Sequence, residues 1–326
     1  MTSFPTRRLR RLRNTEKMRE LVQETHLSPK DLICPVFVQE DIETKKQAES
    51  MPAIERLPLS DVTNEVQEIS DLGIPAIMLF GIPKSKDDEG NSAFADDGIV
   101  QKAISDIRKS FDDKIVIMSD VCLCQYTSSG HCGIIKDKKI HNDSSIATLA
   151  KIAVSQAKAG VDVVAPSAMM DGQVVAIRQS LDDAGFTDVA IMSHSAKHRS
   201  HFYSPFRDAA HCAPQFGDRK SYQVPYTNPR EALREVETDV NEGVDIVMIK
   251  PALAYLDLIA ETKKRFNVPV SAYSVSGEYA LVKAAANQGW VDEKDMTNEI
   301  LYSIKRAGAD MIVTYFAKSF ASSFQG

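Results

Sequence analysis

Short apolar runs alternate with longer amphipathic stretches along almost the whole chain. The apolar runs are rich in β-branched residues and nearly continuous, which is typical of parallel strands covered on both faces. Eight of them predict strands at 31–38, 76–81, 114–121, 161–167, 189–195, 244–251, 269–275 and 309–315. Between them, apolar residues recur every three or four positions and predict helices, for example at 144–160, 228–243 and 296–309.

One phrase recurs where a helix gives way to a strand. A glycine, a small residue, an aspartate and a buried strand follow one another in GVDVVAPS, GVDIVMIKP and GADMIVTYF. The irregular spacing of these phrases excludes a solenoid and indicates a repeated strand–helix unit. Eight units, with no G-x-G-x-x-G after any strand, favour an α/β fold of the (β/α)8 TIM-barrel class over an open dinucleotide-binding sheet.

The remaining segments divide the chain into an arm and one catalytic domain. Residues 1–30 are predicted to form an N-terminal arm that packs on a neighbouring subunit, and residues 31–326 the barrel. The connections at 82–98 and 197–227 are long and polar, and loops of this length in a compact domain are usually functional. Because segment 197–227 mixes aromatic residues, prolines and arginines, we predict that it is a lid over the site.

Composition changes this picture little. A hydrophobic content of 43% and a charged content of 26% are those of an ordinary globular protein, and a net charge of −6 gives no reason to expect nucleic acid or an anionic membrane as a partner. The sequence contains no run of eighteen apolar residues, so we predict no membrane span. It also lacks an apolar signal-peptide core, which predicts a cytoplasmic protein with reduced thiols. The arm is the exception, with five arginines before Glu16. A nucleic-acid arm or a transit peptide can look similar, but the acidic whole favours a subunit contact.

The end of the third predicted strand carries the most specific motif, DVCLCQYTSSGHCG. Its thiols Cys122, Cys124 and Cys132 come from one loop, and thiolates select zinc in a reducing compartment. Three protein ligands leave a position open for water or substrate, as in catalytic zinc sites, whereas His131 as a fourth ligand would close the site. A redox switch and unligated thiols are the alternatives. We assign no role to Cys212.

Lysines follow at neighbouring strand ends. In a (β/α)8 barrel the reacting groups lie at the C-terminal ends of the strands. The fifth predicted strand leads into Ser193, Ser195 and Lys197, and the sixth ends at Lys250, so we expect these side chains to converge. Burial and a nearby like charge both lower the pKa of a lysine, and a neutral amine can form a Schiff base with a ketone. Either lysine alone is better explained as a surface residue with a buried stem.

Polar groups for an acidic substrate lie in the lid and at the last two strand ends. Arg207 and Arg219 can reach inward from the lid, and a guanidinium suits a carboxylate. Ser276 and Tyr315 offer hydroxyl donors for a second polar group. Together with the amine and the thiols, these residues indicate a small keto acid as the substrate.

The motifs resemble the porphobilinogen synthase (5-aminolevulinate dehydratase) family of the zinc–cysteine type. The resemblance covers nearly the whole chain and is carried by DVCLCQYTSSGHCG, SHSAKHRSHFYSPFRDAAHCAPQFGDRKSYQ, VMIKPALAYLD, VSGEYAL and GADMIVTYFAK, which occur in the family's order. It implies a hydro-lyase of tetrapyrrole (heme) biosynthesis that condenses two molecules of 5-aminolevulinate into porphobilinogen. It also implies a homo-octamer whose arms embrace neighbouring subunits.

The same resemblance assigns roles to individual residues. Lys250 would form the Schiff base with the substrate that ends on the propionate side, with Lys197 as the second active-site lysine and Asp120 as a proton relay. The three cysteines would hold a catalytic Zn²⁺ that polarises the other ketone. The remaining matches are Arg207 and Arg219 for one carboxylate, Ser276 and Tyr315 for the other, and Glu235 for an allosteric Mg²⁺ used by some members.

The chain departs from the family's usual pattern at a few positions, and two other functions stay open. The departures are His194 and His198, where tyrosine is usual, Arg199, around which small residues are usual, and Ser129, where a histidine is common. The first two would place imidazoles near the mouth, and all four leave both lysines and all three cysteines in place. A class I aldolase on the same fold would use Lys250 without a metal. A catalytically inactive barrel that only holds zinc for assembly is the alternative outside enzymes.

Overall fold

The structure, a computed structural model, describes residues 3–324 and contains a closed barrel of eight parallel strands. The strands are β1 (Leu32–Gln39), β4 (Ala76–Ile82), β5 (Val116–Val121), β8 (Val163–Pro166), β9 (Ala190–Lys197), β10 (Ile246–Lys250), β11 (Val270–Ser274) and β12 (Met311–Thr314). They pair in chain order, and β1 also pairs with β12, which closes the cylinder. The predicted (β/α)8 class is confirmed, and each predicted strand overlaps an observed one.

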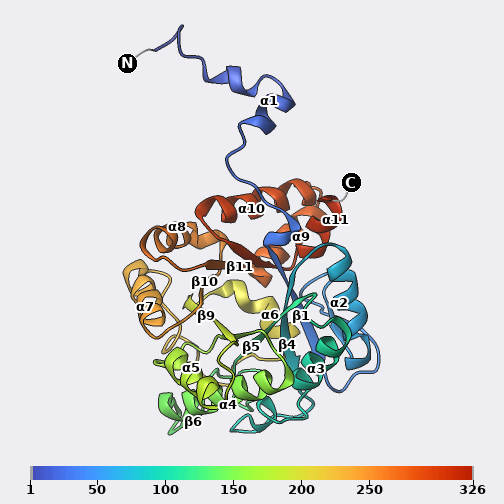
Figure 1. Cartoon of the computed structure of the whole chain (residues 1–326), viewed down its shortest axis with the longest axis vertical. Helices are drawn as coiled ribbons and strands as arrows, with labels where there is room; N and C mark the ends of the chain where they lie inside the picture. The colour runs from blue at the N-terminus through green and yellow to red at the C-terminus, as the bar shows by residue number, and fades with distance from the viewer. Residues whose placement is uncertain (1–2, 325–326) are drawn as a thin grey trace.

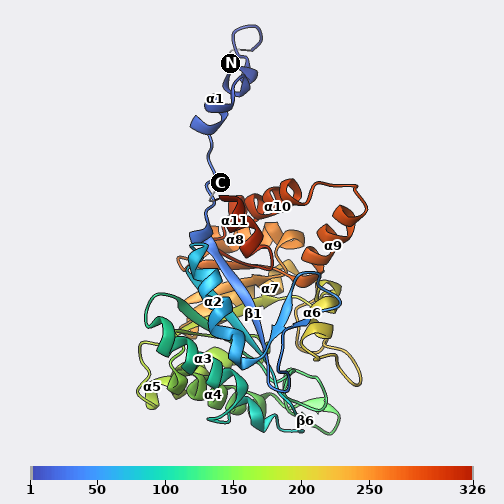
Figure 2. The same cartoon turned by 90° about the vertical axis from the view of Figure 1, so that its right-hand side faces the viewer.

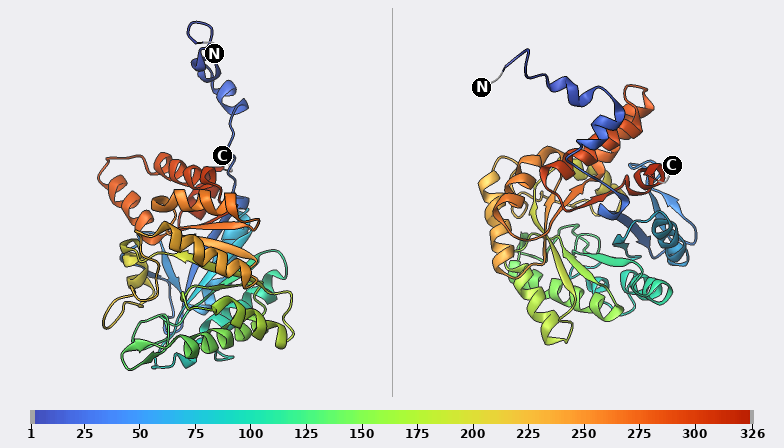
Figure 3. Two further views of the ribbon diagram at one scale, coloured as in Figure 1. Left: turned by 90° about the vertical axis from the view of Figure 1, so that its left-hand side faces the viewer. Right: turned by 45° about the horizontal axis from the view of Figure 1, so that its top comes forward.

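Helices surround the barrel in the order of the chain (Figures 1 and 3). The ring consists of α2 (Val62–Asp71), α3 (Ile99–Phe111), α4 (Asn142–Ala159), α5 (Gln173–Asp183), α7 (Pro229–Asn241), α8 (Leu256–Arg265), α10 (Glu293–Ala307) and α11 (Ala317–Phe324). A further helix, α9 (Ser276–Asn287), lies between β11 and α10. α4 shows why the sequence ends a helix where it does. Gly160 closes it at φ 102°, a conformation that glycine adopts without strain.

The recurring aspartates fix how neighbouring strands start. Asp162, Asp245 and Asp310 each place a carboxylate oxygen 2.7–2.8 Å from a backbone N–H of the preceding barrel strand. The donors are the N–H groups of Ile117, Ile191 and Val270 respectively. Each aspartate thereby extends the strand pairing by one polar contact at the N-terminal end of the barrel, which explains why the phrase recurs.

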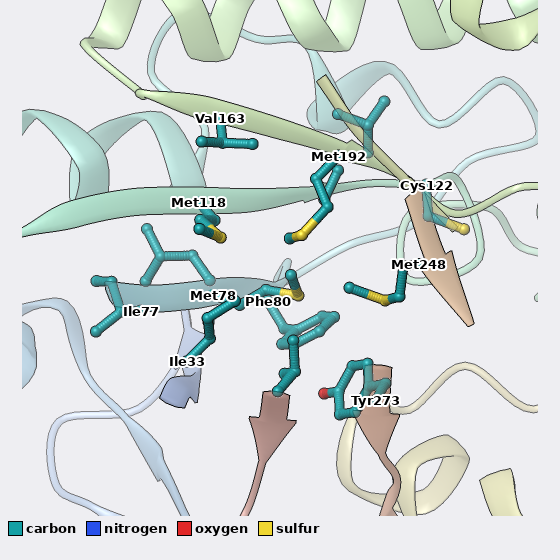
Figure 4. Close-up of a cluster of buried hydrophobic side chains, with 14 of the residues drawn as sticks. Ile33, Ile77, Met78, Phe80, Met118, Cys122, Val163, Met192, Met248 and Tyr273 are labelled. Atoms are coloured by element: carbon teal, nitrogen blue, oxygen red, sulfur yellow. The ribbon is translucent and has the colours of Figure 1, made fainter. Parts of the chain in front are cut away.

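Side chains fill the barrel, so it is a packed core and not a pore (Figure 4). Met78, Met118, Met192 and Met248 come from four different strands and are all buried. Tyr273 of β11 and Cys122 lie toward one end of the same cluster (Figure 4). Unbranched methionines adapt to the irregular space between the eight strands.

The two long connections pack against the cysteine loop instead of extending into solvent. In segment 82–98, which contains η4 (Asn91–Ala93), Asp87 forms a β-bridge with Thr127. Segment 197–227 contains η5 (His201–Tyr203) and α6 (Ser204–Ala209), and its ends are joined by a β-bridge between His198 and Val224. The other short elements are η2 (Pro29–Asp31), β2 (Lys46–Gln47), β3 (Glu55–Leu57), η3 (Leu59–Asp61), β6 (Ile135–Lys136), β7 (Lys139–Ile140) and η6 (Leu253–Tyr255).

The N-terminal arm extends away from the barrel (Figures 1 and 2). It contains η1 (Leu9–Arg13) and α1 (Glu16–Leu21), neither of which has a buried residue. Close packing begins at Leu27, which is buried. The exposed arm is consistent with the predicted contact with another subunit, which stays a prediction. Within residues 3–324, no helix combines the length and the apolar character that crossing a membrane requires.

Candidate active site

The three cysteines of the motif form one buried cluster. Their sulfur atoms all lie within 4.8 Å of one another, and those of Cys122 and Cys124 are 3.4 Å apart. Tetrahedral zinc with Zn–S bonds of about 2.3 Å separates its sulfurs by roughly 3.8 Å, so this donor set fits zinc. In the part of the chain that the structure describes, no other histidine, cysteine or carboxylate belongs to this group of potential ligands.

His131 contacts the lid and not the sulfur cluster. Its Nδ1 lies 3.1 Å from the hydroxyl of Tyr222, and its Nε2 lies 2.9 Å from the carbonyl oxygen of Phe216. Both ring nitrogens therefore have partners in the lid. The potential metal site keeps three protein ligands, which is the arrangement of open catalytic zinc sites.

Sequence reasoning missed Cys212. This thiol is completely buried, and hydrogen bonding to Cys124 and the charge of Arg219 help to lower its pKa to about 7. It comes from the lid and lies against the cysteine loop, a contact between segments almost ninety residues apart. Only the spacing of Cys122, Cys124 and Cys132 was visible as a local pattern, so no signal in the sequence could have found Cys212.

Lys197 and Lys250 end two neighbouring strands and lie side by side. They are partners in the register of β9 and β10, and both are buried. The Lys250 Nζ lies 4.0 Å from the ring centroid of Tyr273 and 5.5 Å from that of Phe206. The Lys197 Nζ donates a hydrogen bond of 2.5 Å to the carbonyl oxygen of Ser167.

The surroundings shift the pKa values of the two lysines in opposite directions. Burial, followed by the charge of Lys197, lowers the pKa of Lys250 to about 7. Burial also lowers the pKa of Lys197, but the charge of the cysteine cluster, Cys132 first, together with that of Asp120 more than offsets this, so that the net shift is upward. One lysine can therefore be a neutral nucleophile at neutral pH while the other remains a cation, and such divergence is typical of catalytic pairs.

Asp120 and the lid arginines lie around these amines. Asp120 is near the end of β5; its carboxylate accepts a 3.1 Å hydrogen bond from Gln125, and its charge raises the pKa of Lys250. Arg219 is buried and donates to the carbonyl oxygens of Gly130, at 3.0 Å, and Cys212, at 2.7 Å. Burial and the charge of Arg219 lower the pKa of Arg207. The Nε of each arginine is buried without a hydrogen-bond partner among the described residues, which leaves a donor for a ligand.

The hydroxyl groups of Ser276 and Tyr315 lie in different surroundings, although the sequence suggested one shared role for them. The Ser276 Oγ donates to the carbonyl oxygen of Phe202 at 3.1 Å and accepts from the N–H of Phe206 at 3.0 Å, so it fastens the lid. The Tyr315 hydroxyl lies 3.1 Å from that of Tyr273, inside the barrel.

The expected convergence is wrong for Ser193 and Ser195. Both hydroxyls act on Asp239 of α7 and help to hold down its pKa, which burial raises to about 6. The Ser193 Oγ also accepts a hydrogen bond of 3.4 Å from Gln173 of α5. Residues of a strand alternate between its two faces, and these two face the helix layer. The two serines therefore act outside the barrel and not at its mouth.

Glu235 lines a cavity of about 700 Å³ whose wall includes the lid residues Phe216 and Tyr222. The cavity is also lined by His131, Asp171 and Glu231. Burial, with Asp239 and Asp171 next in effect, raises the pKa of Glu235 to about 7. A cation bound there would relieve the repulsion between these carboxylates.

A glycine permits the contact between the cysteine loop and the lid. Gly130 has φ 68°, and a Cβ at this position would lie 2.3 Å from the carbonyl oxygen of Ala213. We expect Gly130→Ala to lower the free energy of unfolding by roughly 1–3 kcal/mol, because backbone must move. The matched control is Gly217→Ala, where φ is 60° but no atom lies within 4 Å of the new Cβ. Urea unfolding of both variants measures the difference, and equal midpoints would contradict the contact.

Comparison with known proteins identifies relatives over the whole chain. Residues 6–323 match the family model described as delta-aminolevulinic acid dehydratase. The delta-aminolevulinic acid dehydratase of Bacillus subtilis (strain 168) is 53% identical over 314 residues, which are 96% of this chain and 97% of the relative. That of Archaeoglobus fulgidus is 51% identical over 325 residues and the full length of both chains.

A solved structure agrees in fold. The delta-aminolevulinic acid dehydratase (porphobilinogen synthase) of Toxoplasma gondii ME49, in complex with the reaction product porphobilinogen, superposes with a TM-score of 0.95 at 43% sequence identity. The match covers 97% of this chain and 91% of that one. The chain therefore belongs to the delta-aminolevulinic acid dehydratase family.

Proposed function

We propose that the protein is a hydro-lyase that condenses two molecules of 5-aminolevulinate into porphobilinogen, with loss of water, in tetrapyrrole (heme) biosynthesis. Family membership supports the reaction, and one observation carries the mechanism. The buried amine of Lys250, whose pKa is lowered to about 7, lies beside that of Lys197, whose pKa is raised, and the three-thiol cluster is nearby. Two identical substrates can then be distinguished, since one is held by an amine and the other by a metal.

Lys250 supplies the covalent step in this proposal. Its Nζ electron pair forms a bond to the ketone carbon of one substrate, and the carbonyl oxygen takes up two protons, one from the amine nitrogen and one from an acidic group of the site. When that oxygen leaves as water, the nitrogen lone pair forms the C=N bond of the Schiff base. The rings of Tyr203, Phe206 and Tyr273 surround the amine and exclude water from it, which favours the dehydrated adduct.

The cysteines would hold the metal. Cys122, Cys124 and Cys132 fit zinc by donor type, burial and separation, and His131 does not close the site. When bound, zinc supplies a Lewis acid for the ketone of the second substrate. Hydrogen bonding with Cys122 and Cys124 lowers the pKa of Cys132 well below its ordinary value, and the charges of Arg219 and Lys197 lower it further.

Other side chains would bind the substrate carboxylates and move protons. Arg207 and Arg219 each keep a buried Nε–H without a partner in the described chain, and such donors are costly unless a ligand pairs with them. Ser276 and Tyr315 remain our candidates for the second carboxylate. Asp120 is close enough to Lys250 to influence its charge and is our candidate for a proton relay.

Two further proposals concern assembly and regulation. The arm exposes Phe4, Leu9, Leu12 and Leu21, and burial of these side chains on neighbouring subunits would support a homo-octamer. Light scattering that yields the mass of a single chain would contradict this. Glu235 would bind an allosteric Mg²⁺, a proposal that fails if Mg²⁺ leaves both activity and assembly unchanged.

The decisive experiment is an assay of porphobilinogen formation from 5-aminolevulinate by the purified chain, with zinc and then with a chelator. The proposal requires product that disappears on chelation and returns with zinc. Product that persists would keep the reaction and remove the metal from it. No product under either condition would favour a non-enzymatic zinc-holding barrel, and aldol cleavage that resists chelation would favour a class I aldolase.

A further inference from the structure

Glu278 is a buried carboxylate to which the proposed mechanism gives no role. It lies in the first turn of α9 with 2% of its surface exposed. Three backbone N–H groups donate hydrogen bonds to its oxygens, those of Ala252, Leu253 and Val275. Burial of a carboxyl group costs free energy that such hydrogen bonds offset, and these three come from two different segments of the chain.

One oxygen serves the helix to which Glu278 belongs. Its Oε2 accepts a hydrogen bond of 3.1 Å from the N–H of Val275, which is the N-cap residue of α9. Glu278 is the third residue of that helix, so this contact is an ordinary capping-box bond. It fixes the start of α9 at Ser276, which is one of our candidates for binding a substrate carboxylate.

The other oxygen binds the turn that follows Lys250. The Oε1 of Glu278 accepts from the N–H of Ala252 at 3.1 Å and from that of Leu253 at 2.8 Å. Because Pro251 has no N–H, these two groups are the first backbone donors after the lysine. A helix cap does not require this second contact, so one side chain ties the end of β10 to the start of α9.

The tie acts beyond the point where strand pairing joins the two segments. The last pair in the register of β10 and β11 is Ile249 with Ala272. Lys250 and Ser276 both follow that pair in the chain, so the ladder does not set the distance between them. Lys250 has an independent anchor, because its carbonyl oxygen accepts a hydrogen bond of 3.0 Å from the hydroxyl of Tyr203.

We propose that Glu278 is a positioning residue that sets the distance between the Lys250 amine and a carboxylate-binding group at Ser276; this inference rests on the proposed function. Both groups lie against Phe206, since the Lys250 Nζ is 5.5 Å from its ring centroid and the Ser276 Oγ accepts from its N–H at 3.0 Å. In 5-aminolevulinate only two methylene groups separate the ketone from the carboxylate. One substrate molecule can therefore meet both groups only if their separation is held to that short span.

Glu278→Asp separates the two halves of this contact. Asp31 shows within the same chain that an aspartate can complete a capping box at the third helical position, because its carboxylate accepts a hydrogen bond of 2.8 Å from the N–H of Ser28. The shorter side chain should therefore keep the negative charge and the cap at Val275. It lacks one methylene group and should not reach the turn after Lys250.

The test is the rate of borohydride trapping on Lys250 with two ketones. 5-Aminolevulinate carries the carboxylate, whereas 1-aminobutan-2-one is the same amino ketone without it and is supplied at a concentration that labels the wild-type chain. For Glu278→Asp we expect trapping of 5-aminolevulinate to slow by about 10- to 100-fold, the scale of a misplaced reacting group, and trapping of 1-aminobutan-2-one to stay within about twofold. General damage to the fold would slow both reactions alike.

Asp31→Asn is the matched control at the opposite end of the barrel. Asp31 immediately precedes β1, whereas Lys250 is the last residue of β10. The substitution removes the charge from a capping carboxylate that also accepts a hydrogen bond of 2.7 Å from Lys305. We expect it to lower the melting temperature and to leave the ratio of the two trapping rates unchanged.

The outcomes separate this inference from the function on which it rests. If the wild-type chain gains no adduct with 5-aminolevulinate, the proposed function fails first. If the wild-type chain is labelled and Glu278→Asp keeps its ratio of trapping rates, or Asp31→Asn loses that ratio equally, the positioning role is overturned while the function stands. Should Glu278→Asp not fold, as judged by its melting temperature, Glu278→Gln decides by the same ratio, since an amide has an acceptor on one side only.

Discussion

Replacement of Lys250 by methionine is expected to lower kcat by roughly 1,000-fold or more and to abolish the covalent adduct. Methionine has a similar length and suits a buried position, but it has no amine, and loss of a nucleophile is among the largest effects of single substitutions in enzymes. The measurement is porphobilinogen formation, together with mass spectrometry after borohydride reduction in the presence of 5-aminolevulinate. The wild-type chain should gain the mass of one reduced substrate, and Lys250→Met should gain none.

The pH dependence of trapping tests the electrostatic part of this prediction. Because the pKa of Lys250 is lowered to about 7, the amine is protonated and unreactive below that pH and neutral above it. The trapping rate should therefore rise through pH 7 and then level off. In Lys197→Met, a like charge that helps to lower this pKa is absent, so the rise should move to higher pH.

A matched control is available on the outer surface. Lys102 on α3 is exposed, and Lys102→Met makes the same chemical change on the outer face of a helix. We expect this variant to keep the wild-type kcat and adduct. A Lys250→Met chain that folds, binds zinc and still forms the covalent adduct would show that another lysine is the nucleophile.

The strands were predictable because burial on both faces leaves a local trace. Eight apolar runs bounded by glycine and polar residues are visible without knowledge of their partners, and the order of a parallel barrel follows from the order of the chain. The thiol cluster was predictable for the same reason, since its three cysteines occupy one loop of eleven residues.

The directions of side chains at the end of β9 were not predictable in this way. Between Ser193 and Ala196, β9 uses three steps where β10 uses two, from Val247 to Ile249. This shift in register places one extra residue in β9, and an extra residue reverses the alternation that follows it. Lys197 therefore reaches the thiol cluster although Ser193, an even number of positions earlier, faces α7. The shift depends on a neighbouring strand fifty residues away and has no local signature.

Removal of one thiol from the cluster is the second change for which we expect a large effect. Cys124→Ala should leave two sulfur ligands, lower zinc content well below one ion per chain, and reduce kcat by about 100-fold or more, since Lewis-acid stabilisation is worth several kcal/mol. Zinc content is measured by atomic emission, and activity before and after dialysis against a chelator and zinc. The wild-type chain should lose activity and regain it, whereas the variant should not respond to zinc.

Cys34→Ala is the matched control for this prediction. Cys34 lies in β1 and is buried like Cys124, but it is outside the sulfur cluster. The control therefore loses the same atom from the core without losing a ligand, and we expect it to keep zinc and activity at a small cost in stability. Equal zinc loss in both variants would mean that core damage releases the metal. Full activity of Cys124→Ala without zinc would show that the lysines alone carry out the chemistry. The three-thiol cluster of the wild-type chain would then have no role in catalysis.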